Sequence, residues 1–352
     1  MENSINDLIS NIRPLDEEAM KAARERQSNL AKPAGSLGML EELSIQVAGI
    51  QGRPMPEIRN KVVIVMAADH GVAVEEVSAY PSEVTRQMVS NMLKGGAAIN
   101  ILSRQVGVRV VLVDIGVAYD FPEHPGLINR KIRAGTGNIK TGPAMSRKEA
   151  VEAVLVGAEV ANNEIGWGAD IIAMGEMGIG NSTPSAAIAG VITNKPVSDI
   201  VGRGTGVDDE GLKRKITAVE RALLVNNPNR NDGLDILAKV GGLEIAGLVG
   251  VVLAAAVNHQ PVVVDGFISS AAAMIAVILC PQVRDYLIAA HNSREKGHKM
   301  ILDWLELTPV IDLHLALGEG TGAILAIPIV EASCRILKEM ATFSEAGVSN
   351  KG

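Results

Sequence analysis

Aliphatic runs alternate with longer stretches of helical periodicity along most of this 352-residue chain. The runs begin with KVVIVMAADHG at 61–71 and recur at 109–115, 170–174, 261–265 and, more weakly, 285–290. Helix-like segments separate them, at 83–105, 147–164, 184–193, 208–225, 242–258 and 267–280. A buried strand forms a continuous apolar run, whereas a helix repeats its apolar residues every three or four positions. The alternation therefore predicts βαβ units and a parallel sheet.

The first 60 residues show helical patterning without a strand. One helix is predicted within PLDEEAMKAARERQSNLAK, at 14–32, which has Pro and acidic residues in its first turn. A second is predicted within SLGMLEELSIQVAGIQ, at 36–51, with Ser36 as its N-cap. The KPAGS segment between them has the composition of a turn.

Composition narrows the class of protein. Hydrophobic residues make up 47% of the chain, yet it has only two Trp, three Tyr and three Phe, so the core must be aliphatic. The formal net charge is −7 and no basic stripe stands out, which argues against nucleic acid and anionic membranes as partners. The N-terminus has no signal-peptide core, and the apolar stretch 243–257 is too short to span a bilayer. Cys280 and Cys334 are predicted to be buried thiols, and a cytoplasmic location fits these features.

Polar and glycine-rich residues follow the aliphatic runs, at the point where each predicted strand ends. They are Asp69-His70-Gly71, Asp114 with Gly116, GEMGIGNST at 175–183 and Asp265-Gly266-Phe267. In parallel sheets, ligands bind where the loops gather at the carboxyl ends of the strands. These loops are therefore the expected site.

Two glycine loops are candidate anion sites. GEMGIGNSTP, at 175–184, precedes a helix that Asn181, Ser182 or Thr183 can cap, and it fits either a phosphate cradle or an ordinary capped turn. In VGRGTGVDDEGLKRK, at 201–215, Arg203 and Lys215 fit either phosphate neutralisation or a solvated helical surface. Ser293 is predicted to start a helix, as an anion site or as a plain N-cap. Neither loop is a Walker or a Rossmann fingerprint.

A set of carboxylates remains for the chemistry. The six histidines have no close ligand pair, so no metal is expected, and no motif indicates a covalent nucleophile. Glu176, Asp265 and Glu319 all lie in glycine-rich loops; Glu319 lies in LHLALGEGTGAILA, at 313–326, where glycines sacrifice helix propensity. A partly desolvated carboxylate has a raised pKa and is a better base. The residues thus indicate an α/β enzyme that acts on a small phosphorylated compound.

Seven stretches, in order, resemble the nicotinate-nucleotide–dimethylbenzimidazole phosphoribosyltransferase family. They are KPAGSLGMLE (32–41), AADHGVAVEEVSAYPSEVTRQMV (67–89), GGAAIN (95–100), GEMGIGNSTPSAAI (175–188), GRGTGVDDEGLKRK (202–215), VVVDGFISSAAA (262–273) and LGEGTGA (317–323). Each stretch alone is weak evidence, but the ordered set covers about residues 30–330 and is specific. The resemblance implies a doubly wound α/β domain at 59–291, with helices on both faces, and a smaller helical domain built from 1–58 and 292–352. It also implies a homodimer.

The resemblance also implies a reaction. The family transfers the 5-phosphoribosyl group from nicotinate mononucleotide to 5,6-dimethylbenzimidazole or a related base, without a cofactor. The products are nicotinate and α-ribazole 5′-phosphate, which enters the nucleotide loop of cobalamin. By this resemblance Glu319 is the general base, and Glu176 and Asp265 support it or orient the ribose.

The remaining site residues follow from the same matched motifs. The phosphate is assigned to Lys215, Gly178, Gly180, Asn181, Ser182, Gly202, Arg203, Gly204, Thr205 and Ser293. The aromatic base is assigned to Gln87, Met177 and Leu317, and nothing in the sequence fixes which base is preferred. The alternatives are a phosphosugar- or nucleotide-binding regulatory protein on the same fold and, less favoured because the fingerprint is missing, a nicotinamide dehydrogenase.

Overall fold

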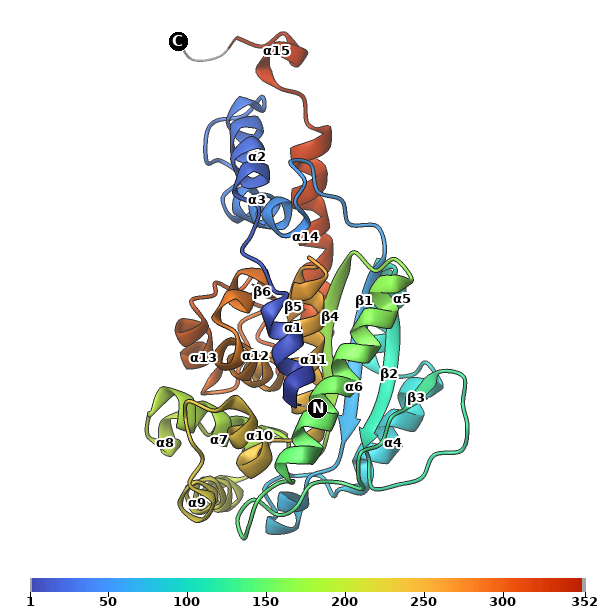
Figure 1. Ribbon diagram of the computed structural model, residues 1–352, viewed down its shortest axis with the longest axis vertical. Helices are drawn as coiled ribbons and strands as arrows, with labels where there is room; N and C mark the ends of the chain where they lie inside the picture. The colour runs from blue at the N-terminus through green and yellow to red at the C-terminus, as the bar shows by residue number, and fades with distance from the viewer. Residues whose placement is uncertain (1, 350–352) are drawn as a thin grey trace.

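A six-stranded, fully parallel sheet forms the centre of the computed structural model, which describes residues 2–349 (Figure 1). Its strands are β1 (Lys61–Ala68), β2 (Val108–Gly116), β3 (Leu127–Asn129), β4 (Ile171–Met177), β5 (Val262–Val264) and β6 (Leu287–Ala289). All five aliphatic runs contain a strand, which confirms the predicted parallel sheet. The short strand β3 was not predicted, because only two aliphatic residues, Leu127 and Ile128, stand together there between Gly126 and Asn129.

The strand order is β3-β2-β1-β4-β5-β6. From β1 the chain adds β2 and β3 on one side of the sheet, and then returns to add β4, β5 and β6 on the other side. Lys61 of β1 is in register with Val108 of β2 on one side and with Ile171 of β4 on the other. The chain therefore winds outward twice from the centre of the sheet, which confirms the doubly wound fold. Loops part at this switch point, beyond the carboxyl ends of β1 and β4, and leave room for a ligand.

Helices cover both faces of the sheet. Val62, Ile64 and Met66 of β1 point into one apolar core, with α1 (Glu2–Ser10), α6 (Arg147–Gly166) and α11 (Leu243–Val257). The alternate residues Val63 and Val65 point into a second core, with α4 (Glu83–Leu93), α5 (Ala98–Val106) and α14 (Thr321–Glu339). Both cores are almost entirely aliphatic, as the composition predicts.

Two further groups of helices extend the molecule. The helices α7 (Ser182–Thr193), α8 (Val197–Ile200), α9 (Asp209–Asn226), α10 (Gly233–Val240), α12 (Phe267–Leu279) and α13 (His298–Leu305) pack on one another beside the sheet. The helices α2 (Glu17–Asn29) and α3 (Met39–Gln51) pack on α14 and stand apart from the sheet, with α15 (Phe343–Ala346) beyond them (Figure 1). Short 3-10 turns occupy Gly71–Glu75 and Pro281–Tyr286.

The division into 1–58 with 292–352 and 59–291 stays a proposal. Within its helical unit, the Nε of Arg26 in α2 donates to the carbonyl oxygen of Leu337 in α14, at 2.7 Å, and thus ties the two chain ends together. The same sequence ranges also contain α1 and α13, which pack on α11 and α12 of the larger unit.

Several predicted boundaries were wrong. The segment 83–105 forms two helices, since the chain turns at Gly95, where φ is +76°. Ser36 is not an N-cap, because α3 begins at Met39 after Gly38. Ser293 does not start a helix either, because α13 begins at His298. The helix expected at Pro184 begins earlier, at Ser182.

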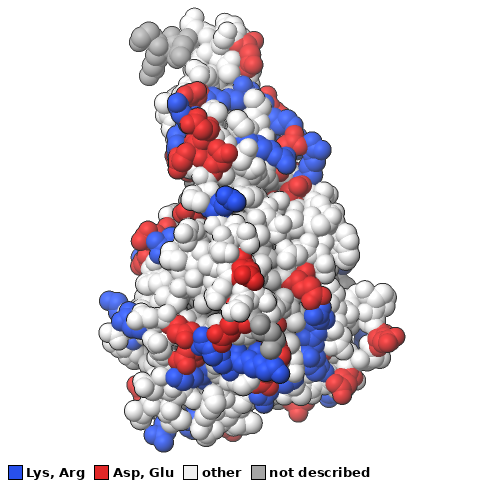
Figure 2. Space-filling view, in the orientation of Figure 1, with Lys and Arg blue, Asp and Glu red and all other residues white. Residues whose placement is uncertain are grey.

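The surface and the thiols agree with the composition. Lys and Arg are interspersed with Asp and Glu on the face seen in Figure 2, without a stripe of one sign. Within residues 2–349 no helix is long and apolar enough to cross a membrane. Cys280 and Cys334 are both free and buried, as predicted, and burial raises the pKa of the Cys334 thiol to about 12.

Candidate active site

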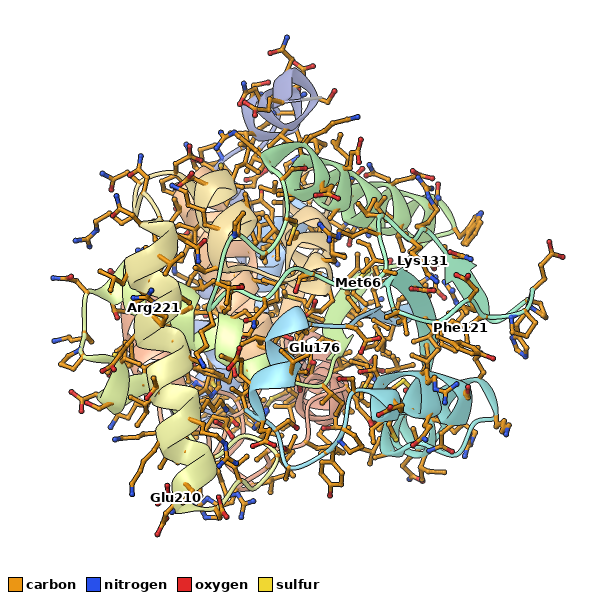
Figure 3. The ribbon with its side chains drawn as sticks, turned by 90° about the horizontal axis from the view of Figure 1, so that it is seen from below. Met66, Phe121, Lys131, Glu176, Glu210 and Arg221 are labelled. Carbon is orange, nitrogen blue, oxygen red and sulfur yellow. The ribbon has the colours of Figure 1, made fainter. Side chains whose placement is uncertain are left out.

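A cavity of about 360 Å³ lies beyond the carboxyl ends of the strands. In a view toward the carboxyl ends of the strands, Glu176 lies near the centre of the molecule (Figure 3). Much of the wall is apolar and much of the rest carries carboxylate, hydroxyl or backbone groups. The lining residues are Tyr80, Val84, Met88, Glu176, Met177, Gly178, Ile179, Asn181, Ser182, Gly204, Thr205, Asp265, Gly266, Phe267, Ile268, His291, Ser293, Glu295, Ala316, Leu317, Gly318 and Glu319.

Glu319 lies in a tight turn directly before α14. Its φ is +62°, and Gly318 and Gly320 on either side have φ values of +87° and +90°. A Cβ at Gly318 would collide with a carboxylate oxygen of Glu176, and one at Gly320 would come within 2.9 Å of Val63. The glycines therefore serve a left-handed turn with close neighbours, and not a helix interior as the propensity of 313–326 suggested.

The Glu319 carboxylate is held with little access to water. Its side chain is almost fully buried, and its Oε2 accepts a hydrogen bond from the backbone N–H of Ile99, in the first turn of α5, at 3.3 Å. Burial raises the pKa of Glu319 above its usual range, with the Ile99 N–H acting against the shift. A raised pKa makes this carboxylate a stronger base than one in water.

Asp265 holds the Glu319 turn in place. It follows β5, and its two carboxylate oxygens accept from the backbone N–H groups of Ala323, at 2.8 Å, and Gly320, at 3.3 Å. These donors belong to the start of α14, so Asp265 acts as a cap supplied from a distant part of the chain. Burial raises the pKa of Asp265 to about 7 against these hydrogen bonds.

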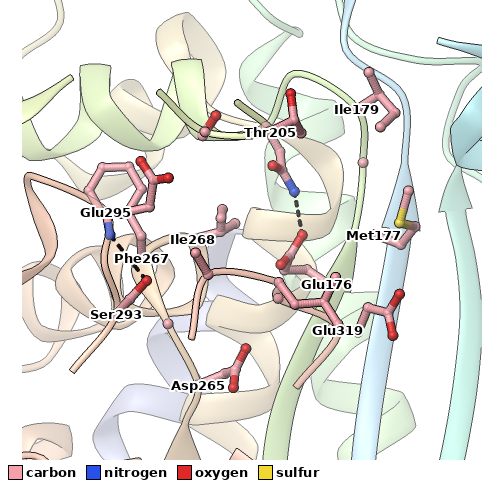
Figure 4. A pocket seen from close by; sticks show the side chains of 18 of the residues that line it. Glu176, Met177, Ile179, Thr205, Asp265, Phe267, Ile268, Ser293, Glu295 and Glu319 are labelled. Atoms are coloured by element: carbon pink, nitrogen blue, oxygen red, sulfur yellow. Dashed lines mark hydrogen bonds between the residues drawn. The ribbon is translucent and has the colours of Figure 1, made fainter. Parts of the chain in front are cut away.

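Glu176, at the end of β4, lies between the two sides of the cavity (Figure 4). Met177 and Glu319 lie on one side of it, and Ser293 and Glu295 on the other. Burial, reinforced by the negative charges of Glu244, Asp265 and Glu319, raises the pKa of Glu176 to about 8. The side-chain amide of Asn181 donates to it. Asn181 occupies the N-cap position of α7, but its side chain makes no capping hydrogen bond to that helix.

Lys215 comes to the wall of the cavity from α9. Its side chain is 1% exposed, and its Nζ donates to the hydroxyl of Ser182 at 2.8 Å. A Cβ added to Gly204 would lie 2.7 Å from the same Nζ, so the glycine loop covers the ammonium closely. Burial lowers the pKa of Lys215 to about 8, and the charge of Glu295 acts against this. Among the described residues no carboxylate lies within 4 Å of Lys215.

The same architecture and sequence occur in known proteins. A family model described as a phosphoribosyltransferase matches residues 12–348. A nicotinate-nucleotide–dimethylbenzimidazole phosphoribosyltransferase from Chloroflexus aggregans is 57% identical over 97% of both chains. The chain belongs to this phosphoribosyltransferase family. A protein of the same name from a Roseiflexus species is also 57% identical, over 99% of this chain and 98% of its own.

Solved structures of this phosphoribosyltransferase family agree with the fold. The enzyme of that name from Thermus thermophilus has 47% identity and a TM-score of 0.91, over 96% of this chain and 100% of its own. The family assigned from the ordered motifs and the predicted α/β class are therefore confirmed.

Most of the residues predicted for this phosphoribosyltransferase converge on the cavity. The lining includes Glu176, Met177, Gly178, Asn181, Ser182, Gly204, Thr205, Asp265, Ser293, Leu317 and Glu319. Gly180, Gly202 and Lys215 lie behind it, in or against the loops that form its wall. Arg203 instead donates to the carbonyl oxygen of Val207 and pairs with Asp209 on the surface. The side chain of Gln87 is exposed on α4 and does not line the cavity.

The sequence analysis missed part of the wall. The missed residues His291, Glu295 and Ala316 lie outside the matched stretches, whereas Tyr80, Val84, Met88, Ile179, Gly266, Phe267, Ile268 and Gly318 lie within them but were given no role. Val84 and Met88 are four residues apart on α4, a spacing that places both on one helix face. No motif marks His291 or Glu295, although Ser293 of the same loop was assigned to the phosphate from the resemblance.

Three histidines of this phosphoribosyltransferase, His70, His291 and His298, are buried. His70 pairs with Glu244 at 2.7 Å beneath the cavity, and both are buried. Burial lowers the pKa of His291, and lowers that of His298 to about 3 with help from His291. Residues 2–349 contain no group of three or more His, Cys, Asp or Glu arranged to hold a metal ion.

Proposed function

We propose that this protein transfers the 5-phosphoribosyl group of nicotinate mononucleotide to 5,6-dimethylbenzimidazole or a related base. The products are nicotinate and α-ribazole 5′-phosphate, for the nucleotide loop of cobalamin. The names of relatives with 57% identity over nearly the whole chain support this substrate pair. The observation that carries the proposal is Glu319, a buried carboxylate of raised pKa at the wall of a largely apolar cavity.

The proposed binding mode uses both kinds of wall. Val84, Met88 and Met177 offer apolar contacts for a flat aromatic base near Glu319. Lys215, with Ser182 and the loop at Gly204, offers a buried positive charge and donors for the 5′-phosphate. The ribose would then lie between them, beside Glu176.

In the proposed reaction, one azole nitrogen attacks C1′ while Glu319 accepts the proton of the other. A C1′–N bond to the azole forms, and the C1′–N bond to nicotinate breaks. Its electron pair returns to the pyridine nitrogen, which becomes neutral and needs no acid. Attack opposite the leaving ring turns the β-nucleotide into an α-riboside. Removal of the proton by a positioned base contributes about 10²–10⁴-fold, and Asp265 keeps that base in position.

The test is product formation from defined substrates. The protein is incubated with nicotinate mononucleotide, with and without dimethylbenzimidazole, and nicotinate and the ribosylated product are measured by liquid chromatography and mass spectrometry. Nicotinate release only with the acceptor, and an α configuration by NMR, are expected. Binding without turnover would favour the regulatory protein on the same fold, and a β product would contradict the mechanism.

The homodimer and the cytoplasmic location expected from the resemblance also remain proposals. Tyr80, Leu313 and Leu317 are exposed apolar residues, and Tyr80 and Leu317 line the cavity. A second copy covering them would explain that exposure. Light scattering after size-exclusion chromatography gives the oligomeric state directly.

A further inference from the structure

Glu295 is an unassigned charge in the wall of the cavity. It lies in the loop between β6 and α13, where its backbone N–H donates to the hydroxyl of Ser293 at 3.3 Å (Figure 4). Its Oε2 is buried and has no hydrogen-bond partner among the described residues. A Cβ at Gly202 would collide with this oxygen, so the carboxylate lies directly against the glycine loop. A buried carboxylate oxygen without a donor is costly, which calls for an explanation.

Lys215 lies against the same glycine loop, at Gly204, two residues after the glycine that Glu295 adjoins. A Cβ added to Gly204 would lie 2.7 Å from the Nζ of Lys215. In the same way, a Cβ added to Gly202 would lie against the Oε2 of Glu295. The two groups have opposite charges, with Glu295 in the lining of the cavity and Lys215 behind it, yet they do not form an ion pair among the described residues. The negative charge of Glu295 is nevertheless felt at Lys215, where it partly offsets the burial that lowers the lysine pKa.

We propose that Glu295 is a specificity-determining residue that limits how tightly the site holds a 5′-phosphate. The inference rests on the proposed function. A phosphate bound by Lys215 and Ser182 would lie against the glycine loop at Gly204. The buried Oε2 of Glu295 already lies against the same loop, at Gly202. No donor of the described residues neutralises that oxygen, so like-charge repulsion opposes the attraction of Lys215. Nicotinate mononucleotide and the α-riboside product both carry the 5′-phosphate, so both are held less tightly. Product release is thereby made easier.

The test compares ligands that differ only in the phosphate. Glu295→Gln and Glu295→Ala both remove the charge, but only Gln offers a new donor. Affinities for nicotinate mononucleotide and nicotinate riboside are measured by isothermal titration calorimetry at a pH well below 8, where Lys215 stays protonated even without the charge that raises its pKa. Both variants are expected to bind the mononucleotide at least about fivefold more tightly, the size of a relieved like-charge contact in a partly buried site. Their affinity for the riboside should equal that of the parent.

Three controls make the result specific. Glu295→Asp keeps the charge and should retain the weaker parental affinity. Glu339→Gln removes an exposed carboxylate at the end of α14, and should change neither ligand. Thermal unfolding checks that each variant is folded. Unchanged or weaker mononucleotide binding in both folded variants would overturn the proposal, and equal weakening of both ligands would make Glu295 a ribose-hydroxyl acceptor instead.

Failure of the proposed function would be recognised separately. If the parent does not bind nicotinate mononucleotide, that function is wrong, and inorganic phosphate becomes the probe for the same loop. Lys215→Met should then abolish phosphate binding, and Glu295→Gln should strengthen it. No strengthening there would overturn the role of Glu295.

Discussion

Charged residues form two groups at the cavity, one in its lining and one behind its wall, and burial acts on their pKa values in opposite ways. In the carboxylate cluster, Glu176, Asp265 and Glu319, it raises each pKa, to about 8 for Glu176 and about 7 for Asp265. At the lysine cradle, formed by Lys215 with Ser182 and Gly204, it lowers the pKa to about 8. A group with a pKa of about 8 is mostly protonated at pH 7. Glu176 is then neutral, whereas Lys215 is still positive.

This difference suits two kinds of ligand. A neutral azole can enter beside Glu176, whose carboxyl group is mostly protonated at pH 7, while the phosphate meets an ammonium that has kept its charge. Burial of the same kind thus prepares one region for proton transfer and the other for anion binding. The comparison predicts that substitutions in the first should change turnover, and those in the second should change binding.

The largest effect is expected for Glu319→Gln, which keeps the shape of the side chain but cannot accept a proton. The turnover number should fall at least about 10²-fold, the lower end for a lost general base, while both substrates still bind. Because the pKa of Glu319 is raised, the parent rate should fall on the acid side at a higher pH than an ordinary carboxylate would give. That limb should be absent from the pH–rate profile of the variant.

An acceptor that needs no base supplies the control for Glu319. A phenolate has already lost its proton, so its transfer should suffer much less in Glu319→Gln than transfer to dimethylbenzimidazole. Near-normal turnover with dimethylbenzimidazole would make the carboxylate structural, and Glu176 would become the next candidate.

Lys215→Ala should change binding instead. Loss of a charge-assisted contact costs roughly 1.5–3 kcal/mol, or about 10- to 150-fold in KM for nicotinate mononucleotide. Because the pKa of Lys215 is about 8, parental affinity for the phosphate should also weaken as pH rises through 8, when the ammonium loses its proton. Steady-state kinetics with mononucleotide and riboside check this. If the variant distinguishes the two ligands as the parent does, another group binds the phosphate.

Asp265→Asn should have an intermediate effect, since Asp265 caps α14 and positions the Glu319 turn. Asn keeps one acceptor and loses the other, so we expect roughly a tenfold loss in turnover, comparable to about 1–2 kcal/mol for a lost cap. The acid limb of the pH–rate profile should remain, because Glu319 is still the base. Loss of that limb would show that Asp265 itself accepts the proton.

The sequence allowed the layers of the fold to be predicted better than the turns between them. Aliphatic runs such as 61–68 and helical periods such as 147–164 extend over many residues, so their pattern identifies them. The turn at Glu319 could not be predicted from local propensity, because its left-handed φ depends on Asp265 and Glu176, more than 50 residues away in the chain. Ser36 and Ser293 had the residue type of a cap, but in each case the helix begins further along the chain.

The site was predicted in the same uneven way. Residues in glycine-rich motifs, such as Ser182 and Asp265, were found because the motif itself marks them. Glu295 and His291 lie on either side of Ser293, which was assigned to the phosphate, but neither belongs to a motif that gives it a role. Arg203 belongs to a matched motif, yet the structure pairs it with Asp209, so its assignment to the phosphate stays a prediction.

The smallest effect is expected for substitutions in α4, which supplies part of the apolar wall near the carboxylates. Two consecutive residues of this helix, Gln87 and Met88, point in different directions. Met88 lines the cavity and is partly buried, whereas the side chain of Gln87 is exposed and turned by about 100° around the helix axis. Met88→Ala should raise KM for dimethylbenzimidazole about fivefold, or roughly 1 kcal/mol for part of an apolar side chain. KM for the mononucleotide should not change. Gln87→Ala should change KM for the base less than Met88→Ala. An equal or larger rise would show that Gln87 reaches the bound base, as the family resemblance implies, and that α4 turns toward the cavity when the base binds.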